Sequence, residues 1–162
     1  MSEGYSVQPI GVIQSLYRDP LDMPFQSCEA QGIRGTAIIV PEWRDGLNDL
    51  AGFDHVWLLW WAHRGRAPEP LVKPFRDTRS RGVFATRVPV RPNPIAMSCV
   101  RLVSVAADRI EFDGVDMLDG TPLIDIKPYV SAWDSHPGIR SGWYDDANRL
   151  QAIADRRFEK RV

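Results

Sequence analysis

Short apolar stretches separated by turn-forming residues recur along most of the chain and predict a series of β-strands. Most stretches are rich in β-branched residues, whereas one is a nearly continuous apolar run with three tryptophans, which is typical of a buried strand. Gly, Pro and Asp residues lie between the stretches, as is usual where a chain turns between strands. The predicted strands span residues 7–15, 36–40, 55–63, 83–88, 98–105, 109–112 and 123–129.

The spacing of these strands favours a mainly β fold. Short strands with turn signals between them are typical of a small β-barrel or a folded sheet, whereas alternating β/α folds place a helix after each strand. Leu47 and Leu50 indicate a short helical turn before Gly52, but only the C-terminus is helical over any length, with Leu150, Ile153, Ala154 and Phe158 on one apolar face. We therefore expect a β-barrel of six or seven strands and a C-terminal helix over about 145–158. We assign residues 1–162 to one domain with a core of 7–145.

Polar and proline-rich segments stand between the strands and are candidates for function. Residues 64–81 form a long polar stretch, and loops of that length are often functional. The run from Arg87 to Ile95 carries three prolines, which fix φ and stiffen the chain between Arg87 and Arg91. The later segment 119–122, Asp-Gly-Thr-Pro, predicts a tight turn that leads into the last strand.

The composition is that of an ordinary globular protein, with 44% hydrophobic and 25% charged residues. No apolar run is long enough for a membrane helix and the N-terminus lacks the pattern of a secretory signal, so we expect a cytoplasmic protein. Cys28 and Cys99 lie far apart, and the three histidines have no neighbours at zinc-ligand spacing. The sequence thus predicts free thiols and no structural metal.

The formal net charge of −1 bears on possible partners. Avid nonspecific binders of nucleic acid are usually strongly basic, since phosphate neutralisation supplies most of that affinity. Any RNA contact would need a local patch, and the arginine-rich region 76–91 is either such a patch or a solvated loop. The chain also lacks a glycine-rich phosphate loop, a Gly-x-Ser-x-Gly elbow and a His-Glu-x-x-His pair, which argues against a Rossmann nucleotide fold, an α/β-hydrolase and a zinc protease.

Three features could carry chemistry, and each has a structural alternative. Asp125 and Lys127 share one face of the last predicted strand, where they can address a polar ligand or form an exposed salt bridge. His63 ends the tryptophan-rich strand, where an imidazole can move a proton or simply pack against aromatic rings. The tryptophans are expected mostly in the core, although one could flank a purine or a sulfonium.

Three long motifs, together with shorter blocks in the first strands, carry a family resemblance. The motifs read Gly82-Val83-Phe84-Ala85-Thr86-Arg87, Arg91-Pro92-Asn93-Pro94-Ile95-x-Met97-Ser98 and Asp119-Gly120-Thr121-Pro122-x-x-Asp125-Ile126-Lys127-Pro128-Tyr129. Over residues 7–145 the chain resembles the TsaA-like β-barrel family. The best-known members of that family are S-adenosyl-L-methionine-dependent methyltransferases of N6-threonylcarbamoyladenosine in tRNA.

The resemblance implies a small barrel that binds S-adenosyl-L-methionine without a Rossmann sheet, commonly as a homodimer. It also implies methyl transfer to the nitrogen of threonylcarbamoyladenosine beside the anticodon. The implied cofactor-binding residues are Gln26, Ser27, Cys28, His63, Arg64, Arg87, Met97, Ser98, Asp116, Asp119, Gly120, Thr121 and Pro122. Among them, Arg87 suits the methionine carboxylate, and Asp116 or Asp119 suits the ribose diol.

The identity of the group that accepts the methyl group is the remaining open question. An amide-like nitrogen is a poor nucleophile, so a base should help to remove its proton, and the candidates are His63, Asp125 and Tyr129. The residues expected to bind the substrate are Arg79, Arg81, Arg91, Asn93 and Lys127. Many tRNA-modifying members carry a second C-terminal domain, whereas one helix is expected here. The sequence therefore leaves three hypotheses: a tRNA methyltransferase first, a small-molecule methyltransferase second, and a noncatalytic barrel that binds a nucleotide or RNA third.

Overall fold

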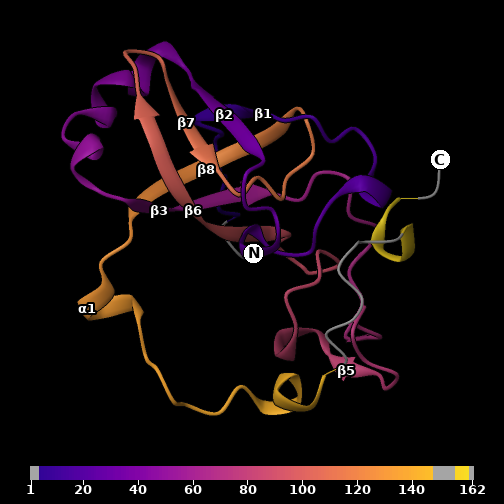
Figure 1. Cartoon of the computed structure of the whole chain (residues 1–162). Coiled ribbons are helices and arrows are strands. Elements are labelled where there is room, and N and C mark those ends of the chain that lie inside the picture. The colour runs from indigo at the N-terminus through magenta and orange to yellow at the C-terminus, as the bar shows by residue number, and fades with distance from the viewer. Residues whose placement is uncertain (1–3, 148–155, 161–162) are drawn as a thin grey trace.

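The computed structural model describes residues 4–147 and 156–160. Its main feature is a closed barrel of six antiparallel strands, seen in the upper part of Figure 1. In order around the barrel, the strands are β1 (Gly11–Gln14), β2 (Arg34–Ile39), β7 (Arg109–Asp113), β6 (Ile95–Val105), β3 (His55–Trp61) and β8 (Thr121–Pro128). The predicted β-barrel is confirmed, and each of these strands overlaps a predicted range.

Antiparallel pairing gives the barrel two distinct ends. Strand β3 runs from one end to the other, and we call these the His55 end and the His63 end. Because each strand residue advances the chain by about 3.3 Å, the two ends of β3 lie roughly 20 Å apart. Strands β1 and β7 finish at the His63 end, where β2, β6 and β8 begin.

Alternating side chains fill the barrel. On β3, Val56 and Leu58 are fully buried, whereas the intervening Trp57 and Leu59 are half-buried. The same alternation buries Ile110 and Phe112 on β7. Each fully buried apolar side chain of this size stabilises the fold by about 1.5–3 kcal/mol relative to exposure, so the barrel interior is the main source of stability.

Short helical turns connect the strands. The 3-10 turns η1 (Pro20–Asp22) and η2 (Ser27–Glu29) lie between β1 and β2. At the His55 end, η3 (Pro41–Leu47) and η4 (Leu50–Gly52) each bury a leucine against the barrel core. None of the helices that the structure describes is long and apolar enough to cross a membrane.

A second cluster of buried residues lies beside the barrel, at the lower right of Figure 1. It is built by residues 64–92 together with residues 156–160, and we call these two segments the arginine-rich module. The module contains the two-stranded sheet of β4 (Leu71–Val72) and β5 (Arg81–Gly82), and the turn η7 (Arg156–Phe158). Its core consists of Val72, Val83, Val88, Val90 and Phe158.

The strand predicted over residues 83–88 is wrong. The chain forms the 3-10 turn η5 (Val83–Ala85), which Thr86 closes by donating from its amide and its hydroxyl to the carbonyl of Val83, at 3.1 and 2.8 Å. The turn directs Val83 and Val88 into the core of the module. Apolar and β-branched content was therefore a sign of burial in this segment rather than of strand pairing.

After β8 the chain leaves the barrel and reaches the module along the bottom of Figure 1. This stretch holds α1 (Ser131–Asp134) and η6 (Gly142–Asp146), and the indole of Trp143 donates to the carbonyl of Ala85 at 2.7 Å. The helix predicted over about 145–158 falls largely on residues 148–155, which lie outside the described residues. On either side of them the chain forms 3-10 turns.

Replacing Phe158 tests whether the C-terminal segment stabilises the protein. The Phe158→Ala substitution should lower the free energy of unfolding by roughly 3 kcal/mol, because it leaves a cavity in the module core. Phe158 is only 5% exposed, whereas Phe84 is 79% exposed, so Phe84→Ala is the matched control and should cost under about 0.5 kcal/mol. Equilibrium urea unfolding measures both changes, and equal losses would contradict the role of Phe158.

Candidate functional site

The His63 end of the barrel brings together most of the predicted cofactor-binding residues. Four chain segments meet there: residues 26–28 around η2, residues 63–64 after β3, residues 97–98 near the start of β6, and residues 116–122, which lead into β8. Their convergence follows from the strand order, since β3, β6 and β8 are neighbours in the barrel. The segments are distant in sequence but adjacent in the fold.

Asp116 lies at the centre of this region and is 5% exposed. Its Oδ1 accepts a hydrogen bond from the hydroxyl of Ser98 at 2.7 Å, and the Ser98 oxygen in turn accepts one from the indole of Trp60 at 3.0 Å. Burial raises the pKa of Asp116 to about 7, although hydrogen bonds and the charge of Arg87 oppose the rise. The carboxyl group therefore changes its ionisation near neutral pH.

The segment 26–28 packs directly on this cluster. The Ser27 hydroxyl donates to the carbonyl of Cys99 at 2.6 Å, and the Ser27 backbone opposes the rise in the pKa of Asp116. Gly114 allows the close approach, since its φ is +93° and a Cβ atom there would lie 2.9 Å from the Ser27 carbonyl oxygen. At the outer side of the segment, Gln26 accepts a hydrogen bond from Arg87 at 3.0 Å.

The predicted turn at 119–122 is confirmed, and it orients Asp119 differently from Asp116. Gly120 has a φ of +78°, and its amide donates to the carbonyl of Ile13 at 2.9 Å. The Asp119 carboxylate accepts from the amide of Ser15 at 3.1 Å and from the guanidinium of Arg18 at 2.9 Å. Both oxygens of Asp119 therefore already have partners, in Ser15 and Arg18. This makes Asp119 less available to a ribose diol than an unpaired carboxylate would be.

His63 and Arg64 follow the end of β3, and Arg64 lies near Arg18, the partner of Asp119. Burial lowers the pKa of His63, and the charges of Arg64 and Lys160 act in the same direction, whereas a hydrogen bond with the Trp61 backbone opposes them. The imidazole is therefore mostly neutral at pH 7 and can accept a proton. Arg64 is engaged by the carboxylate of Glu159 and donates to the carbonyl of Arg18 at 2.9 Å.

The three candidate bases are not brought together. His63 lies at one end of β3, whereas the Tyr129 amide donates to the carbonyl of His55 at the other end, at 3.0 Å. Asp125 lies between them opposite Leu59, and its carboxylate forms an exposed salt bridge with Lys127 at 2.8 Å. Of the three, His63 is the one that lies beyond the end of β3 at which β6 and β8 begin.

The expected substrate-binding residues also divide into groups. Lys127 lies on the barrel wall in its pair with Asp125. Arg81 donates to Asp77 at 2.6 Å and stacks over Trp143, and Arg91 donates to backbone carbonyls within the module, so both arginines have structural roles. Asn93 and Arg79 are exposed, and Arg79 uses only its backbone amide to bind Asp77 among the described residues.

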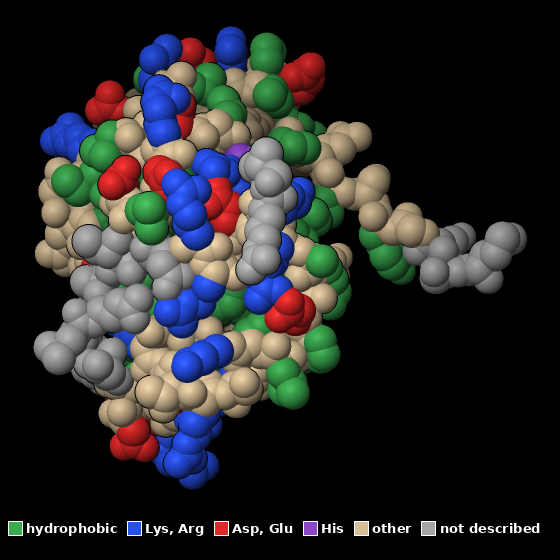
Figure 2. Space-filling view, turned by 90° about the vertical axis from the view of Figure 1, so that its right-hand side faces the viewer, with side chains coloured by type: hydrophobic (Ala, Val, Ile, Leu, Met, Phe, Trp, Pro, Cys, Tyr) green, Lys and Arg blue, Asp and Glu red, His purple; other side chains and the backbone are tan. Residues whose placement is uncertain are grey.

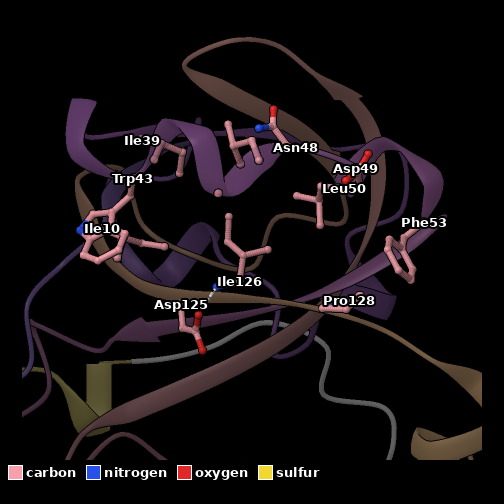
Figure 3. A pocket seen from close by; sticks show the side chains of 12 residues that line it. Ile10, Ile39, Trp43, Asn48, Asp49, Leu50, Phe53, Asp125, Ile126 and Pro128 are labelled. Carbon is pink, nitrogen blue, oxygen red and sulfur yellow. Dashed lines mark hydrogen bonds between the residues drawn. The ribbon is translucent and has the colours of Figure 1, made fainter.

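A pocket of about 440 Å³ opens at the opposite, His55 end of the barrel (Figure 3). Trp43 and Phe53 stand on its two sides, and Leu50 and Ile126 lie between them. The Asp125 carboxylate points away from the middle of the pocket in Figure 3. The pocket is mainly apolar and lies about one barrel length from Asp116, so it is not part of the predicted cofactor site.

Comparison with known proteins identifies the family. Residues 12–135 match the family described as the tRNA-methyltransferase O N-terminal domain. The chain belongs to this family. Its resemblance to TsaA-like barrels, inferred from motifs, is thereby confirmed.

Relatives in the tRNA-methyltransferase O family differ in length. The chain is 42% identical over 149 residues to a probable S-adenosyl-L-methionine-binding protein of Pyrococcus abyssi, covering 91% of this chain and 81% of the relative. It is 32% identical over 153 residues to the tRNA (adenine(37)-N6)-methyltransferase of Escherichia coli, covering 88% and 65% of the two chains. A crystal structure of TrmO from Pseudomonas aeruginosa aligns with a TM-score of 0.73 and 39% identity, over 86% of this chain and 62% of that one.

Sequence reasoning missed the roles of two residues in this family member. Trp60 donates to Ser98 from the inner side of β3, and the alternation Val56-x-Leu58-x-Trp60 could have placed it there. Arg18 pairs with Asp119 across about a hundred positions of sequence, and nothing in the local pattern signals that contact.

Asp116 should make the stability of the protein depend on pH. Its pKa is higher in the folded protein than in the unfolded chain, so its stabilising contribution is present at low pH and is lost as the pH rises through about 7. Between pH 5 and pH 8 the wild type should lose roughly 2 kcal/mol more stability than Asp116→Asn. Urea unfolding across this range measures the difference, and parallel curves for the two proteins would refute the burial of an ionisable Asp116.

Proposed function

We propose that this protein is an S-adenosyl-L-methionine-dependent methyltransferase that acts on adenine 37 of tRNA, at the nitrogen of its threonylcarbamoyl group. The observation that carries the proposal is the cluster around Asp116, in which segments 26–28, 97–98 and 116–122 meet beside Arg87. These segments are the ones that the family motifs assign to the cofactor. Relatives named as S-adenosyl-L-methionine-binding proteins and as tRNA (adenine(37)-N6)-methyltransferases support the same assignment.

The chemistry of the side chains fits the cofactor. Arg87 is exposed and bonded to a neutral amide rather than to a carboxylate, so its charge is available for the methionine carboxylate. The cofactor supplies an electrophilic methyl group, and the chain's task is to align it with the acceptor nitrogen, since positioning provides much of the acceleration. His63, whose pKa is lowered by burial, is the base that we propose for the proton of that nitrogen.

The arginine-rich module supports an RNA partner. Residues 64–92 hold eight Lys and Arg residues but only two Asp and Glu residues, a net charge of +6 within a chain whose net charge is −1. Figure 2 views the molecule from this side and shows blue basic side chains gathered across the middle and lower part of the face. A local charge of this size can bind phosphates even though the whole chain is almost neutral.

We also propose that the protein forms a homodimer in the cytoplasm. The support is an apolar strip on the outer wall of the barrel, where Trp61 pairs with Ile95 and Leu59 pairs with Met97; Ile95 and Met97 are 38% and 43% exposed. Trp133 and Ile139, beyond β8, are also exposed. Such surface is usually covered by a partner. Sedimentation equilibrium tests the dimer, and a single species of 18.4 kDa at micromolar concentration would rule it out.

The decisive experiment for the activity is methyl transfer from labelled cofactor. Purified protein should label tRNA that carries threonylcarbamoyladenosine, and should not label tRNA that lacks this modification. If the labelled methyl group appears in small metabolites and not in tRNA, the protein is a methyltransferase whose acceptor is a small molecule. Absence of calorimetric binding at millimolar S-adenosyl-L-methionine would reject both enzyme hypotheses.

Arg87→Ala should weaken the binding of S-adenosyl-L-methionine by roughly 10- to 100-fold, as expected for loss of a hydrogen bond to a charged group. The fold should keep its stability, because Arg87 is exposed. Isothermal calorimetry measures the dissociation constant. Arg109→Ala is the matched control, since that exposed arginine pairs with Asp108 at the other end of the barrel. Equal affinities in the Arg87→Ala variant and the control would refute the contact.

Arg79→Gln should weaken the binding of tRNA and reduce its salt dependence. One lost phosphate contact lowers the slope of log affinity against log salt by roughly 0.7–0.9. Fluorescence anisotropy with labelled tRNA at several salt concentrations measures the slope, with Arg109→Gln as the control. An unchanged slope would remove Arg79 from the interface.

A further inference from the structure

Phe84 is a large apolar side chain that the fold presents to solvent within the arginine-rich module. It is 79% exposed, whereas Val83 before it and Thr86 two positions after it are buried. Since those two residues face inward, the turn η5 directs the ring of Phe84 away from the module core. A single exposed phenylalanine is ordinary on a protein surface, so its surroundings decide what it can bind.

Arg91 fixes the ring of Phe84 from one side. Its guanidinium carbon lies 5.8 Å from the ring centroid, within the range of a cation–π contact. The same guanidinium donates to the carbonyls of Val83 and Thr86 at 3.1 and 2.8 Å, so the turn that carries Phe84 also holds Arg91. The ring therefore has a preset position, and a ligand that binds to it meets little cost in side-chain entropy.

A second aromatic ring lies beside the same turn. The indole of Trp143 donates to the carbonyl of Ala85, the residue after Phe84, at 2.7 Å. The guanidinium carbon of Arg81 lies 5.5 Å from the centroid of the Trp143 ring. Aromatic rings and arginines thus alternate around one short turn. Surfaces that bind single-stranded nucleic acid have this composition, because rings stack on bases while arginines attract phosphates.

The charge of the module favours an RNA over an apolar protein partner at this ring. Residues 64–92 hold eight Lys and Arg residues and two Asp and Glu residues. An apolar partner would remove guanidinium groups from water without pairing them, which is costly. A phosphate chain pairs with the same groups and releases counterions.

We propose that Phe84 is a stacking platform for one unpaired base in the RNA loop that carries the target adenine. The inference rests on the proposed function, because it takes that RNA as the substrate. Arg87, proposed for the carboxylate of the cofactor, follows Phe84 by three residues, a span of at most about 10 Å. A base stacked on Phe84 therefore holds the loop beside the methyl donor. Bases inside a double helix are already stacked on their neighbours, so the platform selects loops over duplexes.

Affinity for a loop RNA provides the first test. Phe84→Leu keeps an apolar side chain but removes the ring, and it should weaken the binding of a labelled anticodon stem-loop with threonylcarbamoyladenosine by roughly 5- to 150-fold. Phe84→Tyr keeps the ring and should bind within about threefold of the wild type. The slope of log affinity against log salt should not change in either variant, because no charge is altered. Fluorescence anisotropy measures these values, and wild-type affinity in Phe84→Leu would overturn the proposal.

Two controls separate stacking from a general loss of RNA binding. Trp43→Leu removes a ring that is 57% exposed at the His55 end of the barrel, and this variant should bind the stem-loop as the wild type does. A fully paired RNA duplex of the same length should bind equally well to Phe84→Leu and to the wild type. Equal losses for the stem-loop and the duplex would give Phe84 a structural role and contradict the proposal.

Removal of single bases from the loop identifies the base that stacks. Each loop nucleotide is made abasic in turn. One such RNA should bind the wild type as weakly as the intact loop binds Phe84→Leu. Combining that RNA with Phe84→Leu should cause no further loss, because both changes remove the same contact. If the losses multiply at every loop position, no base stacks on Phe84.

Two further measurements test other partners for the ring. By calorimetry, Phe84→Leu should bind S-adenosyl-L-methionine as the wild type does, and a loss would assign the ring to the adenine of the cofactor. By sedimentation equilibrium, Phe84→Leu should assemble as the wild type does, and a change would place the ring in a subunit interface. Either of these results would overturn the proposal.

The proposed function and the role of Phe84 fail in different ways. If the wild type neither binds the stem-loop nor transfers a methyl group to modified tRNA, both are wrong. If the wild type methylates modified tRNA, and Phe84→Leu does so with the same KM for tRNA, the function stands and Phe84 is not a stacking platform.

Discussion

Closure of six short antiparallel strands into one barrel determines where every candidate functional group lies. Because β3, β6 and β8 are neighbours, the segments that leave or enter them at the His63 end must meet, however far apart they are in sequence. The barrel interior is filled by apolar side chains, so most of the polar candidate groups lie at that end and in the adjoining module. Asp116 lies where the apolar barrel interior meets the polar groups at that end: it is buried, and it accepts a hydrogen bond from Ser98 of β6.

A buried carboxylate is a costly element for so small a barrel. Removing a charge from water costs several kcal/mol unless hydrogen bonds replace the lost hydration. The hydrogen bond from Ser98 replaces only part of it, in keeping with the raised pKa of Asp116. The apolar side chains buried in the barrel core supply stability that offsets this cost. A destabilising group that persists at the meeting point of three segments is more readily explained by function than by stability.

Sequence patterns predicted the barrel but not the neighbours of its polar groups. The strands were recognisable because alternation and β-branching directly reflect one buried face, as in Val56-x-Leu58. The same signal failed at 83–88, since those valines are buried by the module and not by strand pairing. The motifs brought Asp116 and Asp119 forward as equals, and only the three-dimensional contacts separate them: Asp119 faces Arg18, whereas Asp116 faces Ser98. Local spacing carries no information on such long-range pairs.

Aromatic stacking joins the cofactor side of the molecule to its basic side. Phe25, next to the segment 26–28, stacks on Phe75 of the module at 4.6 Å, and Phe75 meets Phe158 edge-on at 5.0 Å. Arg76 lies over Phe25 and pairs with Glu29, so the same contact holds a basic side chain beside the cofactor segment. This packing, and not sequence proximity, is what brings the basic residues of the module next to segment 26–28.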